Sequence, residues 1–350
     1  MEIKELLQTA IERNVSDLHI IPDYYPTLRI NDELYPLRQL GMITADISQT
    51  MIFSILNDEQ KENLMANKEI DFGYEHQGFR FRCNVYFTKN RLAAAFRLIS
   101  SKIKTIKELN LPDIFHQFIK PKQGLILITG PTGEGKSTTL ASLINEININ
   151  FTKHIITIED PIEYVYPPGK SIVSQRELHQ DTHSWNIALR SVLREDPNVV
   201  LVGEMRDYDT IQSVITIAET GHLVFSTLHT GSTPEAINRI VDVFPAHQQN
   251  QIVNQLSAVL KVVVAQRLVP DSHQEGRIPA VEILINTPSV AAIIRERKNF
   301  MLDNVLETSE ESGMILMEKY LLKLYREGKI TKETALSYAI RPNEINKFLK

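Results

Sequence analysis

The stretch GLILITGPTGEGKSTT, residues 124–139, decides the fold, because it joins a short apolar run to a glycine-rich loop. Residues 130–137 match the pattern G-x-x-x-x-G-K-S/T, in which backbone amides turn inward around phosphate groups. In this pattern the lysine, here Lys136, reaches the β- and γ-phosphates, and the Ser137 hydroxyl ligates Mg²⁺. An apolar strand is predicted before the loop and a helix from Lys136 onward, so the stretch predicts a nucleotide-phosphate site.

We expect the whole loop and the start of the following helix to bind ATP. Glycines let the backbone approach the phosphates closely, and the helix amino terminus adds partial positive charge. The expected nucleotide-binding residues are Gly130, Pro131, Thr132, Gly133, Glu134, Gly135, Lys136, Ser137 and Thr138. The alternative interpretation, a glycine-rich turn without function, does not explain why a predicted strand and helix flank the pattern.

The chain after residue 113 alternates short apolar runs with segments of helical periodicity. GLILITG, HIITIED, NVVLVGE and HLVFSTLH each end in polar residues, which is typical of a parallel sheet with crossover helices. Ligands bind at the carboxyl ends of strands in such sheets. We therefore predict an α/β fold with an ATPase domain over residues 113–350, whose last 65 residues or so are mostly helical. The polar residues at the predicted strand ends are Gly130, Glu159, Asp160, Glu204 and His229.

Residues 1–99 predict a separate, small α+β domain. A turn is expected near Asn31 and Asp32, a helix from about Ile47 to Met65, and then a hairpin-like strand pair. Gly73, Gly78 and Lys89-Asn90 are the turn signals of that pair. The polar residues 100–112 are expected to be a linker.

Composition limits the class of protein. The 350 residues include 43% hydrophobic and 23% charged residues, ordinary values for a soluble globular protein. A net charge of -5 argues against a nucleic-acid partner. The single cysteine, Cys83, excludes an internal disulfide and a four-cysteine zinc site, and favours a reducing compartment. Without a signal-like or membrane-spanning apolar run, we expect a cytoplasmic protein that meets membranes only through partners.

Acidic residues supply candidates for the chemistry. Glu204 follows the apolar run NVVLV, where a carboxylate can hold Mg²⁺ or its waters and orient an attacking water. The segment IEDPIEY crowds Glu159, Asp160 and Glu163, which repel one another unless a cation such as that of Mg²⁺·ATP lies near. The alternatives are a solvated loop acid and ordinary surface acidity. The phosphate loop in the same domain favours the catalytic interpretation for Glu204.

Histidine and arginine residues could complete the site. His229 ends the run LVFSTL on the expected ligand side, where it could bond the γ-phosphate or an acid, or serve a purely structural role. His222, at the start of that run, is harder to place. Four arginines of the N-terminal domain form either a solvated basic face or arginine fingers for a neighbouring subunit, and the pattern does not decide between these. They are Arg80, Arg82, Arg91 and Arg97.

Four motifs in fixed order carry a resemblance to a known family. GPTGEGKSTT, IEDPIEY, LVGEMRD and ETGHLVFSTLHT resemble the Walker A loop, Asp box, Walker B and His box of the secretion ATPases of type II secretion and type IV pili. The resemblance covers almost the whole chain, since SDLHI and RFRCN resemble that family's PAS-like N-terminal domain. GEMRD, AETGHLV and VDVFP are similar to the retraction branch, the PilT-like twitching-motility ATPases. Assembly ATPases typically carry four zinc-binding cysteines, which one cysteine cannot supply.

The resemblance implies a RecA-like ATPase domain and a homohexameric ring that binds ATP and Mg²⁺ between its N- and C-terminal domains. Ser137 and Glu204, the Walker B acid, would hold Mg²⁺, directly or through water. Glu163 would be the Asp-box acid proposed to activate water, and His229 the His-box residue. Arg82 and Arg97 would complete the site. The implied partner is an inner-membrane pilus platform protein, met at the cytoplasmic face of that membrane.

Two positions depart from the family pattern. Glu134 replaces a small residue of the loop, and an acid so close to phosphate would weaken nucleotide binding unless its side chain points outward. The retraction signature AIRNLIRE reads SVAAIIRE at residues 289–296, with Ala291 and Ala292 in place of a basic and an amide residue. This puts the family's partner contacts at that segment in question.

The expected function is an ATP-hydrolysing hexameric motor for pilus disassembly and retraction. The alternatives are an assembly or DNA-uptake motor of the same superfamily, and a nucleotide-gated switch without useful turnover, which Glu134 keeps open. A DNA translocase is disfavoured by the acidic balance of the chain.

Overall fold

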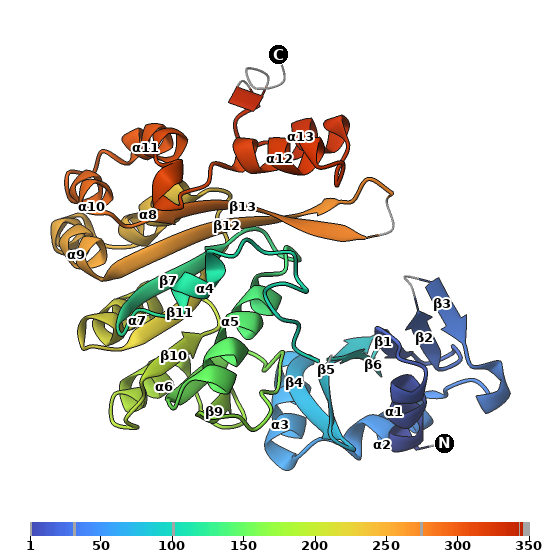
Figure 1. The fold of residues 1–350 in the computed structure, drawn as a ribbon. Coiled ribbons are helices and arrows are strands. Elements are labelled where there is room, and N and C mark those ends of the chain that lie inside the picture. The colour runs from blue at the N-terminus through green and yellow to red at the C-terminus, as the bar shows by residue number, and fades with distance from the viewer. Residues whose placement is uncertain (1, 31–32, 100–101, 274–275, 343, 346–350) are drawn as a thin grey trace. The chain divides into compact units, whose positions relative to one another are not determined.

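The computed structural model describes residues 2–30, 33–99, 102–273, 276–342 and 344–345. The chain divides into two compact units (Figure 1). The first unit consists of Met1–Lys102, Asp160–Val165 and Glu177–Asp181, and the second of Ile103–Glu159, Tyr166–Arg176 and Thr182–Lys350. In the described part of the chain, every helix is too short or too polar to cross a membrane.

A six-stranded antiparallel sheet organises the first unit, in the order β3-β2-β1-β6-β5-β4. Helix α1 buries Ile3, Leu6, Leu7 and Ala10, whose spacing places them on one helical face. These side chains join a core that includes the fully buried Phe81 and Phe96. The strands are β1 Asp17–Ile20, β2 Thr27–Ile30, β3 Glu33–Pro36, β4 Glu69–His76, β5 Phe79–Thr88 and β6 Arg91–Leu98; the helices are α1 Ile3–Glu12, α2 Ala45–Phe53 and α3 Asp58–Asn67.

Four expectations for this unit need correction or restriction. The single helix predicted from about Ile47 to Met65 is two helices, because the Asn57 side chain accepts from Gln60 N at 2.8 Å and begins α3 anew. Gly73 lies within β4, whereas the turn at Gly78 and the two-residue turn at Lys89-Asn90 are confirmed. The turn expected at residues 31–32 and the first two residues of the expected linker lie outside the described residues.

A seven-stranded sheet forms the centre of the second unit, in the order β13-β12-β7-β11-β10-β8-β9. The run from β12 through β8 is parallel, as predicted, and its central strands are buried on both faces. Strand β13 runs antiparallel to β12, so the sheet is mixed rather than purely parallel. The strands are β7 Gly124–Thr129, β8 His154–Glu159, β9 Ile172–Glu177, β10 Val199–Val202, β11 Leu223–Leu228, β12 Leu260–Pro270 and β13 Arg277–Ile285.

Helices lie on both sides of this sheet (Figure 1). The helical character predicted for the C-terminal segment is confirmed by α10 to α13, and Thr287 caps α10 with its hydroxyl accepting from Val290 N at 3.3 Å. Ala291 and Ala292, which depart from the family signature, are half-buried on α10. The helices are α4 Phe115–Phe118, α5 Lys136–Asn150, α6 Trp185–Val192, α7 Tyr208–Glu219, α8 Thr233–Asp242, α9 Ala246–Val259, α10 Pro288–Arg295, α11 Leu302–Thr308, α12 Met317–Arg326 and α13 Lys332–Tyr338.

Candidate nucleotide-binding site

The glycine-rich loop connects β7 to the amino terminus of α5, as the sequence predicts. Gly130, Gly133 and Gly135 have φ angles of 151°, 84° and 77°, a region of backbone space that favours glycine. A Cβ atom on Gly130 would lie 2.5 Å from the Gln266 carbonyl oxygen, so this glycine also permits a close approach of two backbones. Gly135 is the N-cap of α5 and offers its first turn no side-chain acceptor, the arrangement found where helices bind phosphate.

Lys136 lies inside the curve of this loop. Its side chain is buried, and its ammonium group donates to the carbonyl oxygens of Gly130 at 2.7 Å and Pro131 at 2.8 Å. The lysine is therefore held at the centre of the loop by neutral acceptors. A phosphate oxygen is a stronger, charged acceptor for the same group.

The Glu134 side chain contacts strand β12. Its carboxylate accepts a hydrogen bond from the Leu268 backbone N–H, and Oε1 lies 3.8 Å from Nη1 of Arg267. Both oxygens of the Glu134 carboxylate thus face residues of strand β12.

Glu204 and His229 are brought together at the carboxyl ends of two neighbouring parallel strands. Glu204 follows β10 and His229 follows β11, and Nε2 of His229 lies 3.1 Å from Oε2 of Glu204. The other carboxylate oxygen, Oε1, lies 2.7 Å from Nη2 of Arg206. Sequence reasoning missed Arg206, although its position two residues after Glu204 in an extended segment was the available signal. His222 lies at the opposite end of β11 and bonds Ile217 O at 3.0 Å.

A pair of threonines fastens the end of β7 to the end of β11. The Thr129 and Thr230 hydroxyl oxygens are 2.6 Å apart, and Thr230 N donates to Thr129 Oγ1 at 2.9 Å. Thr129 precedes Gly130 and Thr230 follows His229. The hydrogen bonds between the two threonines therefore hold the start of the phosphate loop next to the residue that follows His229.

The three acids of IEDPIEY are divided between the two units. Glu159 ends β8, is buried, and accepts from the Thr157 hydroxyl at 2.6 Å and from Gln175 Nε2 at 3.3 Å. These bonds give Glu159 a structural role in the second unit. Asp160 and Glu163 belong to the first unit, where Glu163 is half-buried.

Arg82 and Arg97 are direct cross-strand partners on β5 and β6 of the first unit. Arg97 donates from Nε to Asp17 Oδ1 at 3.0 Å, whereas Arg82 makes no ion pair with another described residue. Like charges placed opposite each other repel, and a bound anion would relieve that repulsion. Arg80 and Arg91 are engaged in ion pairs with Glu177 and Asp23 of the same unit, which favours structural roles for these two.

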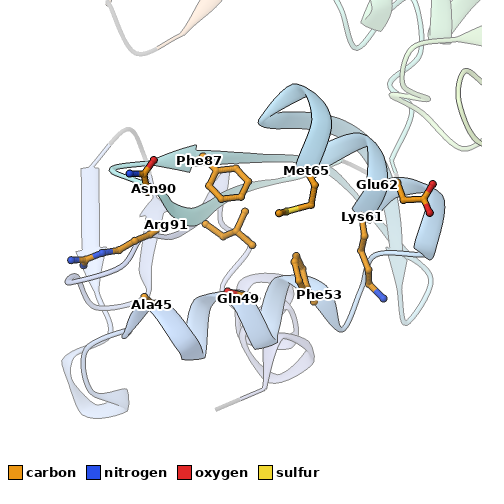
Figure 2. Close-up of a pocket in the computed structure, with 10 residues that line it drawn as sticks. Ala45, Gln49, Phe53, Lys61, Glu62, Met65, Phe87, Asn90 and Arg91 are labelled. Carbon is orange, nitrogen blue, oxygen red and sulfur yellow. The ribbon is translucent and has the colours of Figure 1, made fainter.

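A pocket of about 390 Å³ lies in the first unit between α2, α3 and the β5–β6 turn (Figure 2). Phe53, Met65 and Phe87 point into it, and Leu92 also lines it. This apolar lining lacks the glycine loop and helix amino terminus that suit phosphate, so the pocket is unrelated in chemistry to the loop of the second unit.

The oxygen donors of the second unit fit Mg²⁺. Across the described residues there is no group of three or more His, Cys, Asp and Glu side chains able to hold a metal. Mg²⁺ in nucleotide sites usually takes only one or two protein oxygens and fills its shell with phosphates and waters. The Ser137 hydroxyl at the start of α5 and the Glu204 carboxylate are donors of the right kind.

A phosphate loop after a central parallel strand, with an acid after a strand of the same sheet, defines the class of P-loop nucleotide-binding proteins. A family model described as "Type II/IV secretion system protein" matches residues 1–336, and the chain belongs to this family.

Relatives and a solved structure agree with this placement over nearly the whole chain. A "Twitching motility protein" of Neisseria gonorrhoeae is 43% identical over 334 residues, 95% of this chain and 89% of the relative. The "Type IV pilus retractation ATPase PilT" of Pseudomonas aeruginosa is 41% identical over 345 residues, 98% of this chain and 99% of the relative. The "Crystal Structure of the Pilus Retraction Motor PilT and Bound ADP" is similar with a TM-score of 0.92 and 42% identity, and covers 99% of each chain.

Proposed function

We propose that the chain is an ATP-hydrolysing motor that powers retraction of type IV pili. The observation that carries the proposal is the common sheet edge at which the phosphate loop, Glu204 and His229 meet, in a chain that matches pilus-retraction ATPases over nearly its full length. The chain is an ATPase of the secretion family, and the pilus is the load that its relatives' names indicate.

The loop residues act first by binding and orienting the triphosphate. Backbone N–H groups of the loop and of the first turn of α5 surround the phosphates, and Lys136 exchanges the carbonyls of Gly130 and Pro131 for phosphate oxygens. Ser137 and Glu204 would hold Mg²⁺, which when bound neutralises charge on the β- and γ-phosphate oxygens. His229 orients the Glu204 carboxylate through the 3.1 Å contact with Oε2.

Two further residues complete the site. Arg82, paired across the strands with Arg97, supplies a cation to the γ-phosphate of a neighbouring subunit. Glu163, the Asp-box acid, accepts a proton from the attacking water. This arrangement requires a ring, and we propose a homohexamer. Its partner is a pilus platform protein of the inner membrane, met at the cytoplasmic face.

The test compares purified Lys136→Ala and Glu204→Ala with the wild-type chain in a phosphate-release assay. We expect each variant to lose at least about 100-fold in turnover, because Lys136→Ala removes the cation proposed to bind the phosphates and Glu204→Ala removes the acid proposed to hold Mg²⁺. Lys153→Ala, which removes an exposed lysine beyond the end of α5, is the matched control and should retain wild-type turnover. Full activity in either site variant contradicts the proposal.

Further measurements test the proposed ring and separate the alternative functions. Light scattering should report six copies of the 40.0 kDa chain in the presence of nucleotide. Deletion of the gene should leave surplus, immobile pili, whereas absent pili would indicate an assembly motor. Turnover of only a few events per hour would indicate a nucleotide-gated switch.

A further inference from the structure

We propose that Glu134 is a positioning residue: it fastens the phosphate loop to strand β12 and thereby tightens nucleotide binding, although it carries the same charge sign as the ligand. The inference rests on the proposed role of the loop in binding nucleotide. It assigns a function to the residue that departs from the small amino acid usual at this position of the family.

Three consecutive residues of β12 hold Glu134. Gln266 Nε2 donates to the Glu134 carbonyl oxygen at 2.6 Å, the Leu268 N–H donates to carboxylate oxygen Oε2, and Arg267 Nη1 lies 3.8 Å from Oε1. The Glu134 side chain is only 17% exposed and that of Arg267 is 23% exposed. Both ends of the glutamate, main chain and side chain, are therefore bound to one strand.

The Glu134 carboxylate accepts a backbone hydrogen bond from β12 at a position where β7 no longer pairs with that strand. Pairing between β7 and β12 ends at Thr129 and Ala265, because β7 gives way to the loop there. From Gln266 onward, β12 continues its ladder only with β13. The edge of β12 that faced β7 thus needs other acceptors, and a buried N–H without one is costly. Glu134 provides this acceptor for Leu268.

Gln266 extends the attachment to the helix that follows the loop. It is buried, and its Oε1 accepts from the Thr139 hydroxyl at 2.8 Å while its Nε2 serves the Glu134 carbonyl. Its side-chain amide thus joins the loop to the first turn of α5. Because β12 is bonded to β7 and β13, it is a rigid support against which the loop is preorganised.

The negative charge of Glu134 is largely compensated by its partners on β12. A negative charge 3.8 Å from a guanidinium, and bonded to a backbone N–H, exerts much less field on a phosphate than an isolated carboxylate would. Removing the side chain would therefore loosen the loop more than it would relieve repulsion. Preorganisation lowers the cost of ordering the loop around its ligand, so its loss weakens affinity.

The two views of Glu134 predict opposite signs in one titration. We would titrate the full-length protein with fluorescently labelled ADP, with and without Mg²⁺, for wild type, Glu134→Ala and Glu134→Gln. Glu134→Ala should bind about 10-fold more weakly, in keeping with the loss of one charge-assisted hydrogen bond. Glu134→Gln keeps an oxygen acceptor for the Leu268 N–H and should stay within about 3-fold of wild type.

Hydrogen exchange measures how well Glu134 holds the loop in the absence of nucleotide. Amides of residues 130–139 should exchange faster in nucleotide-free Glu134→Ala than in wild type, and Glu311→Ala, which removes an exposed acid, should change neither exchange nor affinity. Equal or tighter ADP binding by Glu134→Ala, or unchanged exchange in the loop, overturns the inference. Should Glu134→Ala not fold, Arg267→Met leaves the loop sequence intact and should weaken ADP binding in wild type but not in a Glu134→Gln background.

Lys136→Ala distinguishes failure of this inference from failure of the proposed function. If Lys136→Ala binds ADP as tightly as wild type, the loop is not the nucleotide site and the proposed function fails. If Lys136→Ala loses binding while Glu134→Ala does not, only the role given to Glu134 is wrong.

Discussion

Arg341 neutralises two fully buried acids near the end of the second unit, and its removal offers the sharpest test of what holds the C-terminal helices to the sheet. Its guanidinium Nη1 lies 2.7 Å from Glu282 Oε2 on β13 and 3.2 Å from Glu318 Oε2 on α12. It also bonds Asp303 on α11. We predict the effect of Arg341→Met, which keeps the length and apolar stem of the side chain and removes its charge.

The magnitude follows from the burial of the partners. The side chains of Glu282 and Glu318 have no exposed surface, so each would be left with a buried charge and one cation fewer. Breaking a buried ionic network on one side costs roughly 3–5 kcal/mol of the free energy of unfolding. Asp303 is half exposed, so the loss of its ion pair with Arg341 adds little to the loss of unfolding free energy. With a urea m-value of ~3 kcal/mol per molar, the unfolding midpoint falls by roughly 1–1.7 M.

The loss of unfolding free energy caused by Arg341→Met should depend on pH. Burial raises the pKa of the Glu318 carboxyl above its usual 4.5, and the charge and backbone N–H of Arg341 partly offset this rise. A raised carboxyl pKa means that the folded state favours the protonated form of Glu318. The stability that protonation of Glu318 contributes is therefore present below pH 4.5 and is lost as pH rises through the folded-state pKa. Loss of the guanidinium raises that pKa further, so Arg341→Met should lie closer to wild type at pH 5 than at pH 8.

The single tryptophan makes the measurement specific to the second unit. Trp185 begins α6 and is half-buried there, so its fluorescence in urea reports unfolding of this unit alone. Arg326→Met, which removes an exposed arginine of α12, is the matched control and should change the free energy of unfolding by less than about 0.5 kcal/mol. A loss below ~1 kcal/mol for Arg341→Met at pH 8, or a loss that is the same at pH 5, would refute the reasoning.

Two further outcomes can be measured. Gly130→Ala should weaken ADP binding at least 10-fold in the same fluorescence titration, because its Cβ would lie 2.5 Å from the Gln266 carbonyl oxygen at a φ of 151°, and unaltered affinity would mean that the loop is not as tightly packed as described. The Cys83 thiol, whose pKa is raised by burial, should react with Ellman's reagent at pH 8 only after urea unfolds the first unit, and rapid reaction of the native protein would contradict its burial.

Much of the second unit could be predicted from the sequence because its signals are local. An apolar strand, a glycine pattern and a helix start are contiguous in residues 124–139, and the acids and histidine at strand ends follow from the parallel order of the strands. Strands β12 and β13 were not predicted as such. Segments of nine to eleven mainly apolar residues, interrupted by polar ones, fit a buried helix or a strand equally well, and only their pairing decides.

What the sequence could not provide is the orientation of side chains that depend on distant partners. Glu134 sits in a loop whose pattern suggests conflict with phosphate, and its accommodation depends on Leu268, 134 positions later in the chain. The helix break at Asn57 was missed because its cap is a single residue inside an otherwise helical pattern.

The bridge between Thr129 and Thr230 has a consequence for engineering chimaeras of this family. Each hydroxyl is buried and its partner lies about a hundred positions away, so neither segment retains its local geometry if the other is replaced. A chimaera that exchanges the glycine loop alone would place a foreign strand end against Thr230, without the hydrogen bonds that Thr129 makes there. The smallest transplantable part is thus discontinuous in sequence: the loop together with the histidine turn, carried over as a matched pair.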